Sequence, residues 1–170
     1  PTFRDGYTYM PELDFLSSDI IKENPETLFL IRSHSNLTRD NAISKPQKDY
    51  LNIIYPQNEY DMHDLFIEAD LLITDYSSSL FDFALLGKPI ILFVPDLEEY
   101  KNTIRGLYFD IEYLKLEIVH TIEELSKKIK EFQEVKYNSN YNVNDFNNRF
   151  NHDRALPPHK VLDYLYSKQQ

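Results

Sequence analysis

The sequence predicts an α/β domain in which a parallel β-sheet is covered by helices on both faces. The segments "LLIT" (residues 71–74) and "PIILFV" (residues 89–94) are nearly continuous apolar runs, typical of strands buried on both faces. Around such runs, apolar residues recur at helical spacing, so strands and helices alternate along the chain. The 170 residues are 42% hydrophobic, enough to bury one core, and residues 1–170 are expected to form a single domain.

The first half of the chain supplies two helices and three strands, each recognised from its apolar spacing and its terminating residues. In order these are a helix in "ELDFLSSDIIKEN" (12–24), strands in "TLFLIRSH" (27–34) and "YLNIIYP" (50–56), a helix in "YDMHDLFIEAD" (60–70) and the strand "LLIT" (71–74). Pro25 and Pro56 follow the first helix and the second strand, and each marks an end because proline cannot continue either element.

The second half continues the alternation. A helical stripe that includes Leu80 and Ala84 ends at Gly87, a candidate C-cap, and the strand "PIILFV" follows. The segment "EIVHTIEELSKKIKEF" (117–132) predicts one more strand and helix, with Thr121 and Glu124 spaced as a capping box. The remainder, residues 137–170, is expected to be a C-terminal tail that becomes helical near residues 161–166.

Charge and composition exclude several functions. The chain has 18 basic and 28 acidic residues and a formal net charge of −10, which disfavours non-specific binding to nucleic acid or to an anionic membrane. Cysteine is absent, so disulfides and thiolate metal sites are excluded. With only 3 glycines, the sequence contains neither of the familiar glycine-rich phosphate loops. A phosphate-bearing ligand would need backbone and hydroxyl donors.

Three consecutive serines offer such donors. Ser77, Ser78 and Ser79 lie between a predicted strand and a predicted helix, where open parallel sheets bind ligands and where helices present free N–H groups. A plainer interpretation is also open: one serine caps the helix and the others fill a solvated turn. By the same reasoning Asp75 braces the turn, and Asp82 lies in the first helical turn as a partner of the helix dipole.

Residues 69–112, "ADLLITDYSSSLFDFALLGKPIILFVPDLEEYKNTIRGLYFDIE", carry a family resemblance. The order of "ITDYSS", "FDFA", a Lys-Pro strand, "DLEEY" and an "RGLYFD" element resembles the CDP-glycerol glycerophosphotransferase family, the teichoic acid and capsule polymerases. "PTFRD" at the start and "LFLIRSH" also match, so the similarity extends to about residue 149. The resemblance implies a Rossmann-like sheet that forms the C-terminal, donor-binding half of a GT-B fold. The acceptor half would then lie upstream of this chain.

The resemblance also implies roles for individual residues. His34 is the candidate catalytic residue, its imidazolium neutralising charge on the leaving CMP. The candidate substrate-binding residues are Arg32, Asp75, Tyr76, Ser77, Ser78, Ser79, Asp82 and Arg105. Ser77 and Ser78 are expected on the diphosphate, with Ser79 supporting them. No cofactor and no metal are expected, because GT-B enzymes generally rely on protein donors.

For two of these residues, a purely structural role is an alternative to ligand binding. Arg32 is expected to contact phosphate or to brace the fold, and Arg105 to lie over the donor phosphates or to form a salt bridge. The arrangement of Asp75 and Tyr76 is expected to shape the turn that carries the serines.

The function implied by the resemblance is transfer of a polyol phosphate from CDP-glycerol, or another CDP-polyol, to a growing teichoic acid or capsule polymer, with release of CMP. The acceptor, a polyol-phosphate polymer or glycan, and any membrane association would involve the rest of a longer protein. That protein is expected at the inner face of a bacterial cell membrane, on the cytoplasmic side, and no nucleic acid partner is expected. The isolated domain is expected to be inactive.

Two alternatives stay open: the C-terminal domain of a GT-B glycosyltransferase that uses a nucleotide sugar, and a flavodoxin-like binding module without catalysis. The donor is open as well. Pro157 and Pro158, in "NHDRALPPHKVLDYL" (151–165), stand where the family has an acidic pair and a glycine. This departure leaves two interpretations: the donor is CDP-ribitol or another CDP-polyol, or the contact with the donor is made differently.

Overall fold

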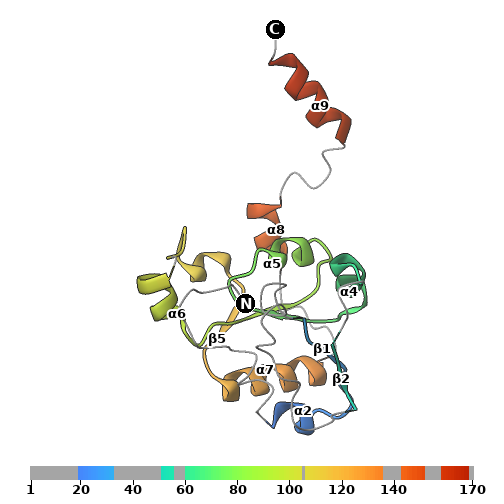
Figure 1. Ribbon diagram of the computed structural model, residues 1–170, viewed down its shortest axis with the longest axis vertical. Helices are drawn as coiled ribbons and strands as arrows, with labels where there is room; N and C mark the ends of the chain where they lie inside the picture. Colours follow the sequence, from blue (N-terminus) through green and yellow to red (C-terminus); the bar gives the residue numbers. More distant parts are fainter. Residues whose placement is uncertain are drawn as a thin grey trace.

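The computed structural model describes residues 19–32, 51–55, 60–104, 106–135, 143–151 and 158–168. Within them, parallel strands alternate with helices, as predicted (Figure 1). The strands are β1 (Phe29–Leu30), β2 (Ile53–Ile54), β3 (Leu72–Thr74), β4 (Ile90–Phe93) and β5 (Glu117–Val119). Their hydrogen bonds form two parallel groups, the pair β1-β2 and the sheet β3-β4-β5, where a single sheet was expected.

A shared hydrophobic cluster joins the two groups. Phe29 of β1 and Ile53 of β2 belong to the same cluster as Ile73 of β3 and Val119 of β5. The two-residue strands β1 and β2 offer few backbone hydrogen bonds, so side-chain packing carries the connection between the groups.

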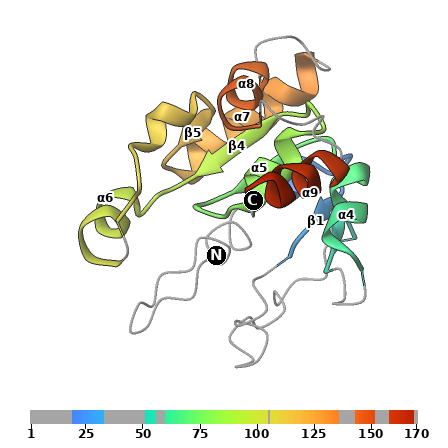
Figure 2. The same ribbon diagram turned by 90° about the horizontal axis from the view of Figure 1, so that it is seen from above.

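Helices cover both faces of the three-stranded sheet. The described helices are α2 (Ile20–Glu23), α4 (Met62–Glu68), α5 (Ser79–Ala84), α6 (Leu97–Glu99), α7 (Ile122–Val135), α8 (Asn144–Phe150) and α9 (Pro158–Ser167), with a π-helix at Tyr100–Ile104 and a 3-10 helix at Ile111–Leu114. Of these, α9 lies away from the sheet (Figure 1). Figure 1 shows α5 and α8 on one side of the sheet and α2 and α7 on the other. In both Figure 1 and Figure 2, α4 and α6 lie at opposite sides of the fold.

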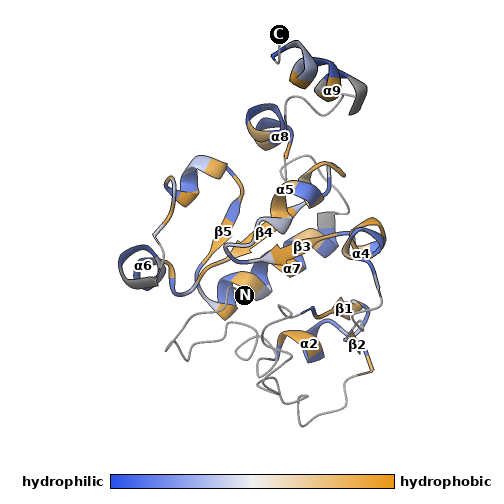
Figure 3. Cartoon of the chain, turned by 45° about the horizontal axis from the view of Figure 1, so that its top comes forward, coloured by the Kyte–Doolittle hydropathy of each residue, from blue (hydrophilic) through white to orange (hydrophobic). Residues whose placement is uncertain are grey.

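Strand β4 is the centre of the core. Ile90 and Leu92 point into the cluster that contains α4, α5 and α8, whereas Ile91 and Phe93 point into the cluster that contains α2 and α7. All four side chains are buried. Figure 3 shows the hydrophobic colour along β3 and β4, whereas α4 and α5 carry both colours. Burial on both faces explains why β4 has no polar alternation.

The predicted caps of two helices can be compared with the structure. Gly87, just beyond α5, has a φ of +71°, and its N–H donates to the carbonyl oxygen of Ala84 at 3.0 Å. At the start of α7, the N–H of Glu124 donates to Oγ1 of Thr121 at 3.2 Å, and the N–H of Thr121 donates to Oε2 of Glu124 at 3.3 Å. The capping box is therefore confirmed, whereas the C-cap of α5 is Leu85 and the predicted Gly87 takes its left-handed conformation two residues later.

The C-terminal region, expected as a tail from residue 137, contains two helices with different environments. The sequence did not predict α8, yet its Phe146 and Asn147 are fully buried against the rest of the domain. Asn147 donates its Nδ2 hydrogen to the carbonyl oxygen of Ala84 at 2.6 Å. The helix predicted at residues 161–166 is confirmed as α9, whose side chains from residue 162 to 168 are exposed. None of the helices among the described residues combines the length and apolarity needed to cross a bilayer.

Candidate functional site

The serine turn, defined here as residues 77–79, connects β3 to α5. Ser77 Oγ accepts two hydrogen bonds from Ser79: one from its backbone N–H at 3.3 Å and one from its hydroxyl at 2.9 Å. Ser78 is exposed, and its side chain makes no capping hydrogen bond. The side chain of Ser77 instead accepts from the N–H of Ser79, the first residue of α5. Ser77 is therefore both the residue that caps the helix start and a residue predicted to bind the ligand.

The two incoming bonds determine which hydroxyl protons the turn can offer. A serine oxygen has two lone pairs and one proton, so Ser77 with both lone pairs occupied has its own proton left to donate. Ser78 presents a second hydroxyl to solvent. Ser79 uses its proton on Ser77 and therefore supports it. The turn thus offers two uncharged O–H donors beside a helix start.

Tyr76, predicted to shape this turn, connects it to the loop after β4. Its hydroxyl donates to Oδ1 of Asp96 at 2.9 Å. Its ring stacks on that of Tyr100, with centroids 3.7 Å apart and planes 14° from parallel. The Tyr76 hydroxyl is therefore directed to protein and not to solvent.

The two aspartates of the predicted set lie in different environments. Asp75 is buried, with 8% of its surface exposed, immediately after β3. Asp82 is exposed in the first turn of α5, where a carboxylate interacts favourably with the helix dipole. The position of Asp82 agrees with its structural interpretation as a partner of the helix dipole.

Arg32 follows β1 and braces the start of α4. Its Nη1 donates to the carbonyl oxygen of Tyr60 at 2.7 Å. Next in the chain, Asp61 caps α4 by accepting from the backbone N–H of His63 at 2.7 Å, and it also contacts His63 Nδ1 at 2.9 Å. The backbone hydrogen bond from His63 is the main cause that lowers the pKa of Asp61, and the charge of Arg32 adds to it. Of its two expected roles, Arg32 has the bracing contact.

His34 and Arg105 lie outside the described residues. Two contacts connect the residues before Arg105 with those after it. The N–H of Gly106 donates to the carbonyl oxygen of Tyr100 at 3.2 Å, and Lys101 forms an ion pair with Asp110 at 3.5 Å.

The carboxyl ends of three parallel strands bring the serine turn, Asp96 and His120 to one edge of the sheet. β3, β4 and β5 are adjacent and parallel, so the residues that follow them share that edge. His120 Nδ1 lies 3.1 Å from the carbonyl oxygen of Val94, which joins the ends of β5 and β4. Sequence reasoning missed Asp96, Tyr100 and His120 as members of this edge. The available signal was the position of Asp96 and His120 shortly after apolar strands; Tyr100, beyond α6, had no such signal.

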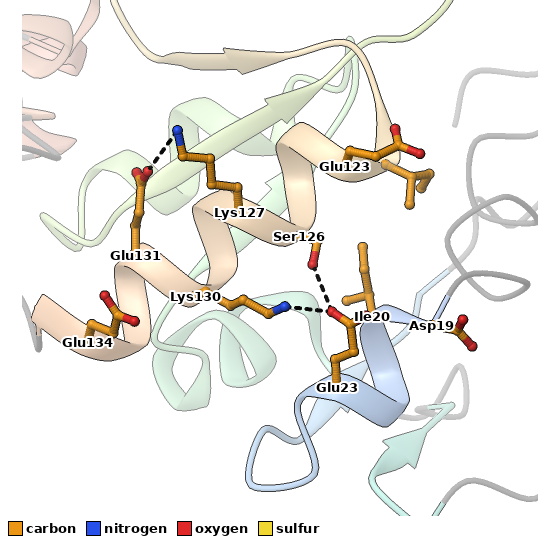
Figure 4. Close-up of a pocket in the computed structure, with 10 residues that line it drawn as sticks. Asp19, Ile20, Glu23, Glu123, Ser126, Lys127, Lys130, Glu131 and Glu134 are labelled. Atoms are coloured by element: carbon orange, nitrogen blue, oxygen red, sulfur yellow. Dashed lines mark hydrogen bonds and ion pairs between the residues drawn. The ribbon is translucent and has the colours of Figure 1, made fainter.

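A surface groove between α2 and α7 is a different feature (Figure 4). Glu23 accepts there from Lys130 Nζ at 2.6 Å and from the Ser126 hydroxyl at 3.3 Å. Five carboxylate and two lysine side chains line it, a balance that disfavours phosphate ligands. The described residues contain no group of three or more His, Asp or Glu side chains that could hold a metal ion.

The family model for CDP-glycerol:poly(glycerophosphate) glycerophosphotransferases matches residues 1–155. This chain belongs to that family. The match covers the serine turn, β4 and the loop after it, so the resemblance read from "ITDYSS" to "RGLYFD" is confirmed.

Relatives of this glycerophosphotransferase family support the assignment. The chain is 34% identical over 158 residues to the teichoic acid poly(glycerol phosphate) polymerase of Bacillus subtilis (strain 168), covering 88% of this chain and 21% of the polymerase. The solved structure of the wall teichoic acid polymerase TagF matches with a TM-score of 0.70 and 30% identity, over 97% of this chain and 40% of that one. A TagF variant described with CDPG matches with a TM-score of 0.66 and 28% identity, over 93% and 38%.

These likenesses confirm the predicted fold class, a Rossmann-like α/β domain of the GT-B kind. The chain spans between about a fifth and two fifths of the length of the proteins it matches. The family of the chain is therefore established. The reaction that a whole protein of this family carries out is proposed in the next subsection.

Proposed function

We propose that this chain is the donor-binding part of a CDP-glycerol glycerophosphotransferase. The observation that carries the proposal is the serine turn: Ser77 and Ser78 hold hydroxyl donors at the carboxyl end of β3, within a family-matched segment. Hydroxyl groups can donate to the oxygens of a diphosphate, and hydrogen bonds to a charged acceptor are stronger than those between neutral groups. The TagF variant described with CDPG supports CDP-glycerol as the donor.

The proposed reaction transfers glycerol phosphate to a polymer. A hydroxyl oxygen of the acceptor attacks the β-phosphorus of CDP-glycerol and releases its proton to water, the bond from that phosphorus to the bridging oxygen breaks, and CMP leaves with the bond electrons. Such a reaction asks the protein mainly for positioning and for stabilisation of phosphate charge. Ser77 and Ser78 donate to non-bridging oxygens, and Ser79 orients Ser77.

His34 and the two arginines complete the proposal. His34, as an imidazolium, neutralises the charge that develops on CMP, and Arg105 lies over the donor phosphates. Arg32 contributes through its bond to Tyr60, which holds the start of α4 in place. A polyol-phosphate polymer is the proposed acceptor, bound by other parts of a longer protein at the inner, cytoplasmic face of a bacterial membrane.

Calorimetric titration of the chain tests this function. CDP-glycerol and CMP are expected to bind, and UDP-glycerol and UMP to bind at least tenfold more weakly. Equal binding of the cytidine and uridine compounds would contradict the proposal. A preference for UDP-sugars would favour a nucleotide-sugar glycosyltransferase, and no nucleotide binding at all would favour a module without catalysis. Tighter binding of CDP-ribitol than of CDP-glycerol would change the polyol but not the reaction.

A further inference from the structure

Two contacts link Tyr76 to the loop after β4, and a third within that loop closes a triangle of Tyr76, Asp96 and Tyr100. The Tyr76 hydroxyl donates to the Asp96 carboxylate at 2.9 Å. The backbone N–H of Tyr100 donates to the carbonyl oxygen of Asp96 at 2.9 Å. The rings of Tyr76 and Tyr100 stack with their centroids 3.7 Å apart. Each residue of the triangle is therefore held by both of the others.

Two members of the triangle are buried and the third, Tyr76, is half-buried. Asp96 and Tyr100 have 9% and 5% of their surface exposed, whereas Ser78 is exposed. A hydrogen bond to a carboxylate is strong in such surroundings, and a stacked aromatic pair adds a preferred orientation. Tyr76 precedes Ser77 directly, so fixing the Tyr76 side chain limits the backbone rotations available to the first serine.

The triangle lies beyond the last paired residues of β3 and β4, where the strands no longer hold the serine turn. β3 and β4 are adjacent parallel strands, but their hydrogen bonds end at the register pair Thr74 and Leu92. Beyond that pair, the turn after β3 leaves the sheet to enter α5. The triangle provides a connection between the two loops past the last register pair of the strands.

We propose that Asp96 and Tyr100 are positioning residues that act through Tyr76 to hold the serine turn in the geometry that binds the donor diphosphate. This inference rests on the proposed function and adds to it two residues that do not touch the ligand. Asp96 fixes the tyrosine hydroxyl by accepting its proton in a hydrogen bond, and Tyr100 fixes the plane of its ring.

The test compares two ligands in each variant. Tyr76→Phe removes the bond to Asp96 and keeps the ring, and Tyr108→Phe is the matched control because Tyr108 is fully exposed. We expect Tyr76→Phe to weaken CDP-glycerol binding by about tenfold, the loss typical of one hydrogen bond to a charged group, and to change cytidine binding less than about twofold. Tyr108→Phe is expected to change neither.

Asp96 offers a rescue experiment. Asp96→Asn keeps an oxygen that accepts from the Tyr76 hydroxyl and is expected to retain CDP-glycerol affinity within about threefold, whereas Asp96→Leu is expected to lose about tenfold or more. Tyr100→Phe keeps the stacked ring and should resemble the wild type, unlike Tyr100→Leu.

The outcomes separate the two proposals. If the unsubstituted chain does not bind CDP-glycerol, the proposed function fails. If it binds, but Tyr76→Phe weakens CDP-glycerol and cytidine equally or weakens neither, the positioning role is wrong and the triangle serves stability alone. Equal affinities of Asp96→Asn and Asp96→Leu would also overturn it.

Discussion

The ammonium group of Lys88 donates a hydrogen bond to the carbonyl oxygen of Ile67 at 2.6 Å. The same nitrogen contacts the carbonyl oxygens of Ala69 at 2.7 Å and Phe66 at 3.4 Å. Lys88 therefore caps the C-terminal end of α4 from the segment that leads into β4, and its positive charge lies at the negative end of the helix dipole. The Lys-Pro element of the family motif is structural at this position.

Replacing Lys88 with methionine is expected to lower the free energy of unfolding by about 1–2 kcal/mol, because the α4 carbonyl groups lose a charged donor while the aliphatic stem is retained. Chemical denaturation measures the loss. Lys127→Met is the control, since Lys127 is exposed on α7 and its nitrogen lies 3.8 Å from the carboxylate of Glu131. A Lys88→Met chain as stable as the control would contradict the capping role.

The serine turn makes a graded prediction. Ser77→Ala removes the proposed donor and the acceptor of Ser79, so we expect about tenfold or more weaker binding of CDP-glycerol. Ser79→Ala leaves the Ser77 proton in place but unsupported, and an intermediate loss of about threefold is expected. Ser126→Ala, in the groove between α2 and α7, is the control. Calorimetry with CDP-glycerol and cytidine measures the order, and a larger loss for Ser79→Ala than for Ser77→Ala would refute this division of roles.

Asn147 is expected to be essential for the packing of α8. Its side chain is fully buried and donates to the carbonyl oxygen of Ala84 at 2.6 Å. Asn147→Leu leaves that carbonyl group without this donor and should cost about 2–3 kcal/mol of unfolding free energy. Asn148→Leu, at an exposed position of the same helix, should cost much less. Thermal and chemical denaturation of both variants compare them, and equal losses would mean that α8 is not anchored by this bond.

The capping box of α7 predicts a dependence of stability on pH. The backbone hydrogen bond from His120, and then that from Thr121, lower the pKa of Glu124 below its ordinary value of 4.5. A carboxylate whose pKa is lower in the folded state stabilises the fold above its unfolded pKa, and this contribution disappears as the pH falls through the folded pKa. Glu124→Gln should therefore be less stable than the wild type at pH 7, and the difference should shrink towards pH 3.

Glu123→Gln is the control for this pH series, because Glu123 is exposed beside Glu124. Denaturant unfolding at several pH values measures the stability difference. A Glu124→Gln difference that stays constant from pH 7 to pH 3 would show that the charge of the capping box is not involved.

Most of the fold could be predicted from the sequence because its strands are apolar on both faces and its helices carry caps. β4 and the capping box of Thr121 and Glu124 were identified in this way and are confirmed, whereas the C-cap of α5 is Leu85 and not Gly87. α8 was not predicted, because its sequence "NDFNNRF" is rich in asparagine and only tertiary contacts bury Asn147.

The candidate site was predicted in part. The serines were identified from their place between a strand and a helix, and the family from the motif order. The contact of Tyr76 with Asp96 was not predictable, because it joins residues 20 positions apart whose meeting depends on the register of β3 and β4. The roles proposed for His34 and Arg105 rest on the resemblance alone.

The double burial of β4 has a consequence for how this register is maintained. In a strand with one polar face, a slip of one residue exposes apolar side chains and is opposed by that cost. β4 would bury hydrophobic residues in either alignment, so polarity does not penalise a slip. Gly87 on one side and Asp96 on the other must then act as fixed end points. A slip of one residue, about 3.3 Å along the strand, would carry Asp96 out of reach of Tyr76. An alignment error in the core would thus break the contact on which the proposed positioning of the serine turn rests.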